Sequence, residues 1–298
     1  MRRWAQHTHL AGLLVLALTA CGRGGRPAPP AAITVTDDAG RTVALARPAA
    51  RIVSLSPAMT ELLFALGAGD RLVGRTTWCD YPPEARAIPS VGDGLNPNIE
   101  AVAARQPDLV VLYRSALTET AAQALTRLGV AATVVKQDRL EDIARAARLL
   151  GRLTGRAAVG DSLARVVAQL LAQPAPAARA RVAFVVWDTP PVVIGSESYL
   201  DELATLAGAV NVFHDLGSAS APVALETIAA RNPDAIVVLR DSLEAEPPRY
   251  ARRREWQVVP AVRKRRFVYL TGSLFGRPSP RAADAAAQFR RALAETLP

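Results

Sequence analysis

Residues Asn98–Leu112 read NIEAVAARQPDLVVL, and residues Ala224–Val238 read ALETIAARNPDAIVV. The two strings share a glutamate near the start, an Ala-Ala-Arg triplet, a Pro-Asp pair and a closing apolar run. Because proline breaks a helix and the closing runs are apolar on both faces, each string predicts a short helix followed by a strand inside a helix-covered sheet. A helix–strand unit that occurs twice predicts two homologous α/β lobes.

A second, fainter repeat precedes each of these strings, in the same order. Glu61 is followed by Gly67 and an alanine, and Glu202 is followed by Gly208 and an alanine. Two repeats in one order favour a duplicated lobe over coincidence. Outside the repeats, apolar and β-branched runs predict further strands at residues 51–55, 72–76, 132–135 and 181–186, and a helix at about 119–128.

The segment between the two lobes has a helical pattern from Leu140 to about Gln173. Gly151 and Gly155 predict a break within it, so that a second helix begins near Arg156 and joins the lobes. The expected fold class is therefore α/β, with two Rossmann-like lobes, central mostly parallel sheets and a ligand cleft between the lobes. The expected boundaries are an N-terminal lobe at 33–153, a connecting helix at 154–175 and a C-terminal lobe at 176–298.

The composition argues against nucleic-acid binding. The chain has 298 residues and a formal charge of +9, from 36 basic and 27 acidic residues. Only Lys136 and Lys264 are lysines, and the arginines are scattered along the chain rather than gathered with aromatic residues in one run. We therefore expect no nucleic-acid partner.

Histidine and cysteine are scarce, which excludes several kinds of site. The histidines are His7, His9 and His214, and the cysteines are Cys21 and Cys79. A His-rich zinc site, a CxxC pair and a disulfide framework are therefore not expected. A Ser-His-Asp triad would depend on His214 alone, and no GxSxG precedes it. We expect no enzyme activity, metal or cofactor, with an exported hydrolase as the remote alternative.

The amino terminus has the order of a secretory signal: a basic start, the apolar run of residues 10–18, and small residues ending at Cys21. Residues 18–21 (LTAC) resemble a bacterial lipobox, in which the cysteine is acylated. Residues 1–21 are thus expected to be a lipoprotein signal peptide, and the Gly/Pro-rich residues 22–32 a flexible tether. The expected location is the cell envelope, on the periplasmic or outer-surface side of a membrane. An ordinary cleaved signal with a chance cysteine is the alternative.

Four strings carry a resemblance to a known family: LSPAMTEL at 55–62, DYPP at 80–83, PPVVIG at 190–195 with Ser198, and RPSPR at 277–281. They resemble the helical-backbone (class III) substrate-binding proteins of ABC importers, and within that class the cobalamin-binding proteins most. The resemblance covers residues 33–298. It implies a monomer that captures cobalamin or a related corrinoid and delivers it to a dimeric membrane permease. Haem or a ferric siderophore is the alternative cargo within the same fold.

Five candidate ligand contacts lie at predicted strand ends, where α/β sheets bind ligands. Ser56 follows the first strand, and Ala58 matches a family contact position that is small enough for a flat ring to approach. Trp78 and Tyr113 match aromatic positions of the family, and Trp187 follows a strand of the second lobe as a candidate from the opposite wall. The alternatives are that Ser56 only begins a helix and that the aromatic residues are ordinary packing residues.

The remaining ligand candidates are Ser273 and Arg277. Arg277 matches a ligand-facing position of the family, where a guanidinium could bond corrin amides or a phosphate. Ser273 lies near a place where the family can carry an acidic residue. The alternative is that Arg277 and Arg281 only serve the final helix and the surface. Two tryptophans of the family fall near Gly94 and Ser220 here, so this site has fewer aromatic residues.

Glu100 and Glu226 match the pair of glutamates, one in each lobe, with which family members dock onto arginines of the importer's membrane subunits. Two carboxylates at equivalent positions suit a two-fold symmetric partner. The alternative is an acidic first turn favourably placed at a helix amino end. For Cys79 a packed thiol and a contact in the site both remain open.

Overall fold

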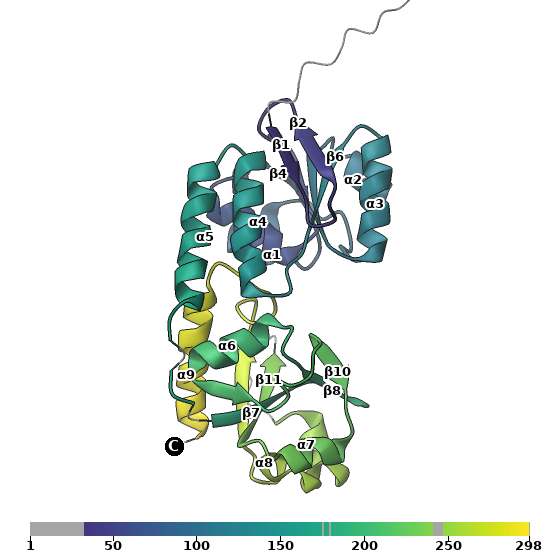
Figure 1. Cartoon of the computed structure of the whole chain (residues 1–298). Helices are drawn as coiled ribbons and strands as arrows, with labels where there is room; N and C mark the ends of the chain where they lie inside the picture. Colours follow the sequence, from purple (N-terminus) through teal and green to yellow (C-terminus); the bar gives the residue numbers. More distant parts are fainter. Residues whose placement is uncertain (1–32, 175, 179, 241–246, 298) are drawn as a thin grey trace, which may run out of the picture. The chain divides into compact units, whose positions relative to one another are not determined.

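The computed structural model describes residues 33–174, 176–178, 180–240 and 247–297 (Figure 1). The predicted signal peptide, the lipidation residue Cys21 and the predicted tether lie outside the described residues. The described residues belong to one compact unit. Among the described helices, none combines the length and the apolar character that crossing a membrane requires.

The N-terminal lobe contains a parallel sheet of four strands in the order β4-β3-β5-β6. Its strands are β3 (Ile52–Ser54), β4 (Leu72–Arg75), β5 (Leu109–Tyr113) and β6 (Ala131–Val135). A separate antiparallel hairpin precedes it, made of β1 (Ile33–Thr36) and β2 (Thr42–Leu45). The helices are α1 (Pro57–Ala65), α2 (Ile99–Ala103), α3 (Ala116–Arg127) and α4 (Leu140–Leu153), with short 3₁₀ turns at η1 (Gly69–Arg71) and η2 (Pro83–Ala87).

The C-terminal lobe contains a mixed sheet in the order β10-β8-β7-β11-β12, with β9 paired to β7. Strands β7, β9, β11 and β12 run parallel, and β8 and β10 are antiparallel additions at one edge. The strands are β7 (Ala180–Asp188), β8 (Pro191–Ile194), β9 (Ala209–Asn211), β10 (Ser220–Pro222), β11 (Ala235–Arg240) and β12 (Phe267–Thr271). The helices are α6 (Tyr199–Ala207), α7 (Leu225–Arg231), α8 (Pro260–Arg263) and α9 (Ala282–Thr296), with 3₁₀ turns η3 (Arg249–Arg252) and η4 (Glu255–Val258).

Helices cover both faces of each sheet, as the doubly apolar strands predict. On β5, Leu109 and Val111 pack on one face with residues of α1 and α4, whereas Val110 and Leu112 pack on the other with residues of α2 and α3. In the C-terminal lobe, α6 and α9 contribute to the core on one face, and α7 and α8 to the core on the other. The predicted α/β class with two mostly parallel sheets is confirmed.

The repeated strings adopt the same backbone in both lobes. Each forms a short helix and an interior strand: α2 and β5 in one lobe, α7 and β11 in the other. Gln106 and Asn232, at equivalent places before the prolines, both have positive φ angles, of 49° and 46°. The aspartates after the prolines act alike: Asp108 accepts a bond from the Arg51 amide at 2.9 Å, and Asp234 accepts one from the Arg181 amide at 2.8 Å. The repeat is therefore present in the structure as well as in the sequence.

The predicted break in the linking segment is present. Helix α4 ends at Leu153, Gly155 has a φ of +68°, and α5 runs over Ala157–Leu171, beside α4 (Figure 1). A Cβ atom on Gly160 of α5 would lie 2.3 Å from the carbonyl oxygen of Ala147 on α4, so this glycine allows the two backbones to approach closely. The predicted boundaries between lobes and connecting helix stay a prediction.

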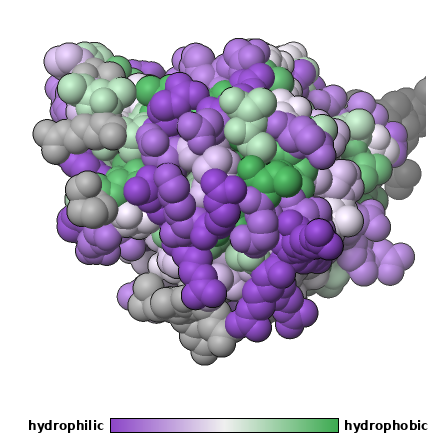
Figure 2. Space-filling view, turned by 90° about the horizontal axis from the view of Figure 1, so that it is seen from below, coloured by the Kyte–Doolittle hydropathy of each residue, from purple (hydrophilic) through white to green (hydrophobic). Residues whose placement is uncertain are grey.

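The end of the C-terminal lobe that carries α7 and α8 presents mainly hydrophilic residues (Figure 2). Residues 249–266, which include α8, contain eight basic residues and one acidic residue. Seven of these eight basic residues are exposed. The interpretation that the arginines are not gathered in one run is therefore wrong for this stretch, although its aromatic residues, Tyr250 and Trp256, are buried.

Candidate ligand-binding site

Two adjoining hollows hold most of the predicted ligand contacts. The first has a volume of about 110 Å³ and the second about 520 Å³, and they share Pro57, Trp78 and Gln137 as lining residues. We call the two hollows together the Trp78 site. Six of the seven predicted contacts line it: Ser56, Ala58, Trp78, Tyr113, Ser273 and Arg277.

The strand ends of the N-terminal sheet supply one wall of this site. Ser56 follows β3, Thr76 follows β4, Tyr113 ends β5 and Gln137 follows β6. Because all four strands are parallel, their carboxyl ends meet at one edge of the sheet. The second wall comes from the C-terminal lobe, through the residues that follow β12, among them Ser273. The structure thus brings six of the predicted residues together at the strand ends, and their role in ligand binding stays a prediction.

Trp78 is the most exposed aromatic side chain of the site. Trp78 is 68% exposed and lies on the turn after β4. Its backbone amide donates to Thr76 Oγ1 at 3.3 Å. An indole with so little packing presents a broad apolar face toward a cavity, which suits a flat ligand. Trp78 is therefore not a core residue, and its role as a ligand contact stays a prediction.

Cys79, the next residue, is a packed thiol. It is fully buried, and the hydroxyl of Thr60 donates to its Sγ at 3.1 Å. Its Sγ also lies 3.1 Å from Thr76 Oγ1. Cys79 therefore anchors the turn that carries Trp78, and it does not line either hollow.

Ser56 and Ala58 combine a structural and a site position. The Ser56 hydroxyl accepts a bond from the Met59 amide at 3.3 Å and so caps α1, as the alternative interpretation held. The same hydroxyl donates to Gln137 Oε1 at 2.6 Å, inside the site. Ala58 is buried yet lines the larger hollow, where a longer side chain would occupy ligand volume.

Tyr113 is held as a neutral phenol. Its hydroxyl donates to Asp138 Oδ1 at 2.8 Å. Burial, reinforced by the hydrogen bond and the charge of Asp138, raises the pKa of Tyr113 to about 12. At neutral pH this side chain therefore offers a hydroxyl and an aromatic ring, not a phenolate.

Arg277 bridges the two lobes inside the site. Its side chain is 11% exposed, and its Nη2 donates to Asp80 Oδ1 at 2.6 Å. Its Nε lies 3.5 Å from Glu61 Oε2 and makes no hydrogen bond among the described residues. The predicted ligand-facing arginine is thus at the site, with two carboxylates of the N-terminal lobe as partners.

Glu61 carries contacts between the lobes that the sequence prediction missed. Its side chain is 4% exposed, and it accepts bonds from Arg281 Nε at 2.7 Å and Nη2 at 2.9 Å. The Ser279 hydroxyl also donates to it. Arg281 additionally stacks over the Tyr81 ring, 3.6 Å from its centroid. The signal that could have found Glu61 is its recurrence as Glu202 in the second lobe.

Three predicted positions lie outside the Trp78 site. Trp187 is near the end of β7, is 63% exposed, and donates through Nε1 to the carbonyl of Thr189 at 3.0 Å. Its role as a ligand contact stays a prediction. Glu100 and Glu226 are exposed residues in the first turns of α2 and α7, at matching places of the two repeats. Their role in docking also stays a prediction.

Metal-binding groups do not gather at the site. His214, the histidine of the C-terminal lobe, places its Nδ1 2.8 Å from Asp201 Oδ2 and lines neither hollow. Within the part of the chain that the structure describes, no three His, Cys, Asp or Glu side chains are arranged to hold a metal ion.

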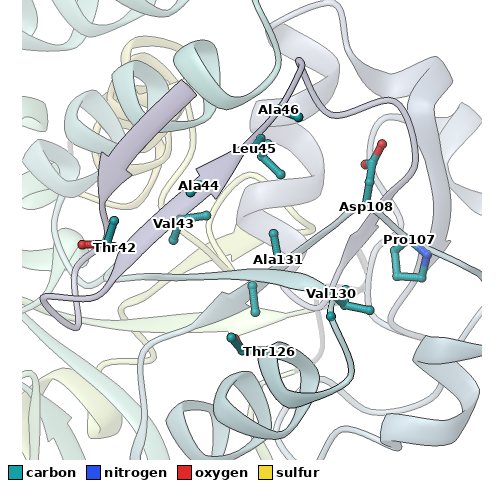
Figure 3. Close-up of a pocket in the computed structure, with 12 residues that line it drawn as sticks. Thr42, Val43, Ala44, Leu45, Ala46, Pro107, Asp108, Thr126, Val130 and Ala131 are labelled. Carbon is teal, nitrogen blue, oxygen red and sulfur yellow. The ribbon is translucent and has the colours of Figure 1, made fainter. Parts of the chain in front are cut away.

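A further cavity of about 560 Å³ lies away from the predicted contacts (Figure 3). It is bordered by β2, by the chain before β5 and by the chain between α3 and β6. Asp108 is its one charged lining residue, and its carboxylate already accepts the amides of Ala50 and Arg51, each at 2.9 Å. This carboxylate fixes the backbone just before β3.

Comparison with known proteins agrees with this architecture. Residues 52–274 match the family described as periplasmic binding protein. The vitamin B12-binding protein of Salmonella typhimurium is 35% identical over 194 residues, which cover 64% of this chain and 72% of that protein. The vitamin B12-binding protein of Vibrio cholerae is 28% identical over 246 residues, which cover 81% of this chain and 88% of that protein.

Solved structures give the same result. The crystal structure of the periplasmic vitamin B12 binding protein of Vibrio cholerae has a TM-score of 0.69 and 27% identity, over 84% of this chain and 98% of that one. A periplasmic haem-binding protein in complex with two haems has a TM-score of 0.72 and 26% identity, over 83% and 99%. With a family match over most of the chain and two lobes of the same architecture, this chain belongs to the periplasmic binding protein family.

Proposed function

We propose that this chain is the substrate-binding component of an ABC importer and that it holds cobalamin or a related corrinoid in the Trp78 site. The observation that carries the proposal is the exposed indole of Trp78 in a hollow of about 520 Å³, formed by the strand ends of one lobe and the loop after β12 of the other. A large flat macrocycle needs such an apolar face together with a few polar groups at its rim.

The polar groups at the rim favour a corrinoid over haem. A haem iron takes an axial ligand such as histidine or tyrosinate. The Tyr113 hydroxyl is engaged by Asp138 at 2.8 Å, and His214 lies outside the lining residues. The hydroxyl of Ser273 and the guanidinium of Arg277 instead suit the amide side chains of a corrin. Haem remains the second candidate, because a haem-binding protein shares the fold with a TM-score of 0.72.

The proposal extends to the partner and the anchor. Glu100 and Glu226, exposed at equivalent places of the two lobes, would meet the two subunits of a permease dimer. A lipid on Cys21, with residues 22–32 as a tether, would hold the protein, as a monomer, at a membrane in the cell envelope. The protein itself performs no catalytic step and carries no cofactor in this scheme.

Calorimetric titration of the purified protein with cyanocobalamin tests this function. We expect tight binding, and we expect Trp78→Phe to weaken it by about tenfold, because the phenyl ring covers less of the macrocycle. Trp187→Phe, examined in parallel, shows whether the second exposed tryptophan also contacts the ligand. Failure to bind cyanocobalamin, together with tight binding of haemin or a ferric siderophore, would overturn the corrinoid assignment.

A further inference from the structure

The lining of the Trp78 site carries more acidic than basic side chains. Its charged lining residues are Asp80, Asp93 and Arg277, two carboxylates against one guanidinium. Asp93 Oδ1 accepts the Leu95 amide at 2.7 Å. The lining as a whole therefore has a formal charge of −1.

The single lining cation is already compensated. Arg277 meets Asp80 at 2.6 Å and Glu61 at 3.5 Å. Glu61 is in turn bonded to Arg281 at 2.7 Å, so the group contains two arginines and two carboxylates and is neutral as a unit. Lys136, next to the lining residue Gln137, faces Asp138 at 4.0 Å and does not line the site. An incoming anion would therefore find no uncompensated positive charge among the lining residues.

Asp80 is the carboxylate of this group that a ligand meets. Its side chain is 46% exposed and lines the larger hollow. Glu61, by contrast, is 4% exposed, lies outside the lining and is fixed by Ser279 and Arg281. Replacing Asp80 therefore changes the charge that faces the ligand and leaves the buried Glu61–Arg281 contact in place.

We propose that Asp80 determines the charge selectivity of the site, so that it takes a ligand edge made of neutral amides in preference to one made of carboxylates. An amide has both a donor and an acceptor, and the Arg277–Asp80 pair offers both in return. A carboxylate has acceptors only, and its charge lies against Asp80 and Asp93. This inference rests on the proposed function and names the ligand chemistry that distinguishes its two candidates.

The test compares two ligands that differ in one group: cyanocobalamin, and its derivative in which one corrin propionamide is hydrolysed to a carboxylate. We expect the wild-type protein to bind the amide form more tightly. Because Asp80 is half exposed, Asp80→Asn should reduce this preference by about fivefold. Asp70→Asn removes the same charge from an exposed residue outside both hollows, and it should leave the preference unchanged.

A second ligand pair keeps the test informative if the cargo is haem. Haemin carries two propionates, and its dimethyl ester carries none. Equal preferences in wild type and Asp80→Asn, for whichever macrocycle binds, overturn the role of Asp80. Tighter binding of haemin than of its ester by the wild type overturns it as well. Absence of cyanocobalamin binding overturns the proposed function instead, so the two failures are distinct. Thermal unfolding of each variant confirms that the fold is retained.

Discussion

Glu61 and Glu202 occupy the same place in the two repeated helices, and each accepts hydrogen bonds from an arginine of the other lobe. Arg281 donates to Glu61 at 2.7 and 2.9 Å. Arg139, which precedes α4, donates to Glu202 at 3.0 and 2.8 Å, and the Leu140 amide adds a bond of 2.7 Å to the same carboxylate. The duplicated glutamate therefore fastens each lobe to the other at two separate points.

The first prediction concerns the more buried of these contacts. Glu61→Gln removes the charge that compensates Arg281 and Arg277. Because breaking a buried ion pair leaves its partner uncompensated, the free energy of unfolding should fall by about 3 kcal/mol. Urea unfolding measures the loss. Glu119→Gln is the matched control: Glu119 pairs with Arg114 at 3.5 Å with both side chains more than a third exposed. Its effect should stay below about 0.5 kcal/mol. Equal losses in the two variants would contradict the bracing role of Glu61.

The second prediction is a pH dependence at the start of α4. Burial alone would raise the pKa of Asp142, but bonds from the amides of Arg139 and Asp138 and from the Arg145 guanidinium outweigh it and hold the pKa below 3.8. The charged form is thus favoured in the folded state. Its contribution to stability is present above the unfolded-state pKa and is lost as the pH falls through the lowered folded-state pKa.

Asp142→Asn should therefore destabilise the protein by about 1–2 kcal/mol at about pH 7 and by clearly less at about pH 3. Chemical unfolding at the two pH values measures both differences. A loss that is the same at both pH values would mean that the side chain acts through packing and not through its charge.

The third prediction concerns the contact between α4 and α5. Gly160→Ala would place a Cβ atom 2.3 Å from the backbone oxygen of Ala147, so the helices must move apart, at a cost of about 1–3 kcal/mol. Gly217→Ala is the control, since a Cβ atom there meets nothing within 4 Å. Denaturant midpoints of the two variants separate the outcomes. No loss at Gly160 would mean that the two helices adjust at little cost.

The sequence was most informative where a pattern is local and repeated. The strings around Pro107 and Pro233 predicted a helix and an interior strand in each lobe, because helix breaking and doubly apolar strands depend on neighbouring residues only. The position of Ser56 and Tyr113 at strand ends followed from the parallel topology. Both features are present in the structure.

Long-range contacts and irregular strands were not predictable in this way. Arg281, the partner of Glu61, lies 220 positions away in the sequence. A glutamate in the sequence does not indicate which of the many arginines it will pair with. Strands β8 and β10 both contain proline, which argues against strand structure, yet they form the antiparallel edge of the sheet, where proline is tolerated. Asp80 stood within a recognised string, but its contact with Arg277 depends on how the two lobes meet.

The last prediction separates docking from helix stabilisation at Glu100 and Glu226. If these exposed carboxylates bind a two-fold permease, Glu100→Ala and Glu226→Ala should each weaken docking to the reconstituted importer by about tenfold while leaving cyanocobalamin affinity unchanged. If they only favour the first turns of α2 and α7, each substitution should instead lower stability by about 0.3–1 kcal/mol and leave docking intact. Glu84→Ala removes an equal charge from an exposed residue of η2 and serves as the control. If all three variants weaken docking equally, the effect comes from the net charge of the protein and not from a specific contact, because a specific contact depends on the position of the carboxylate.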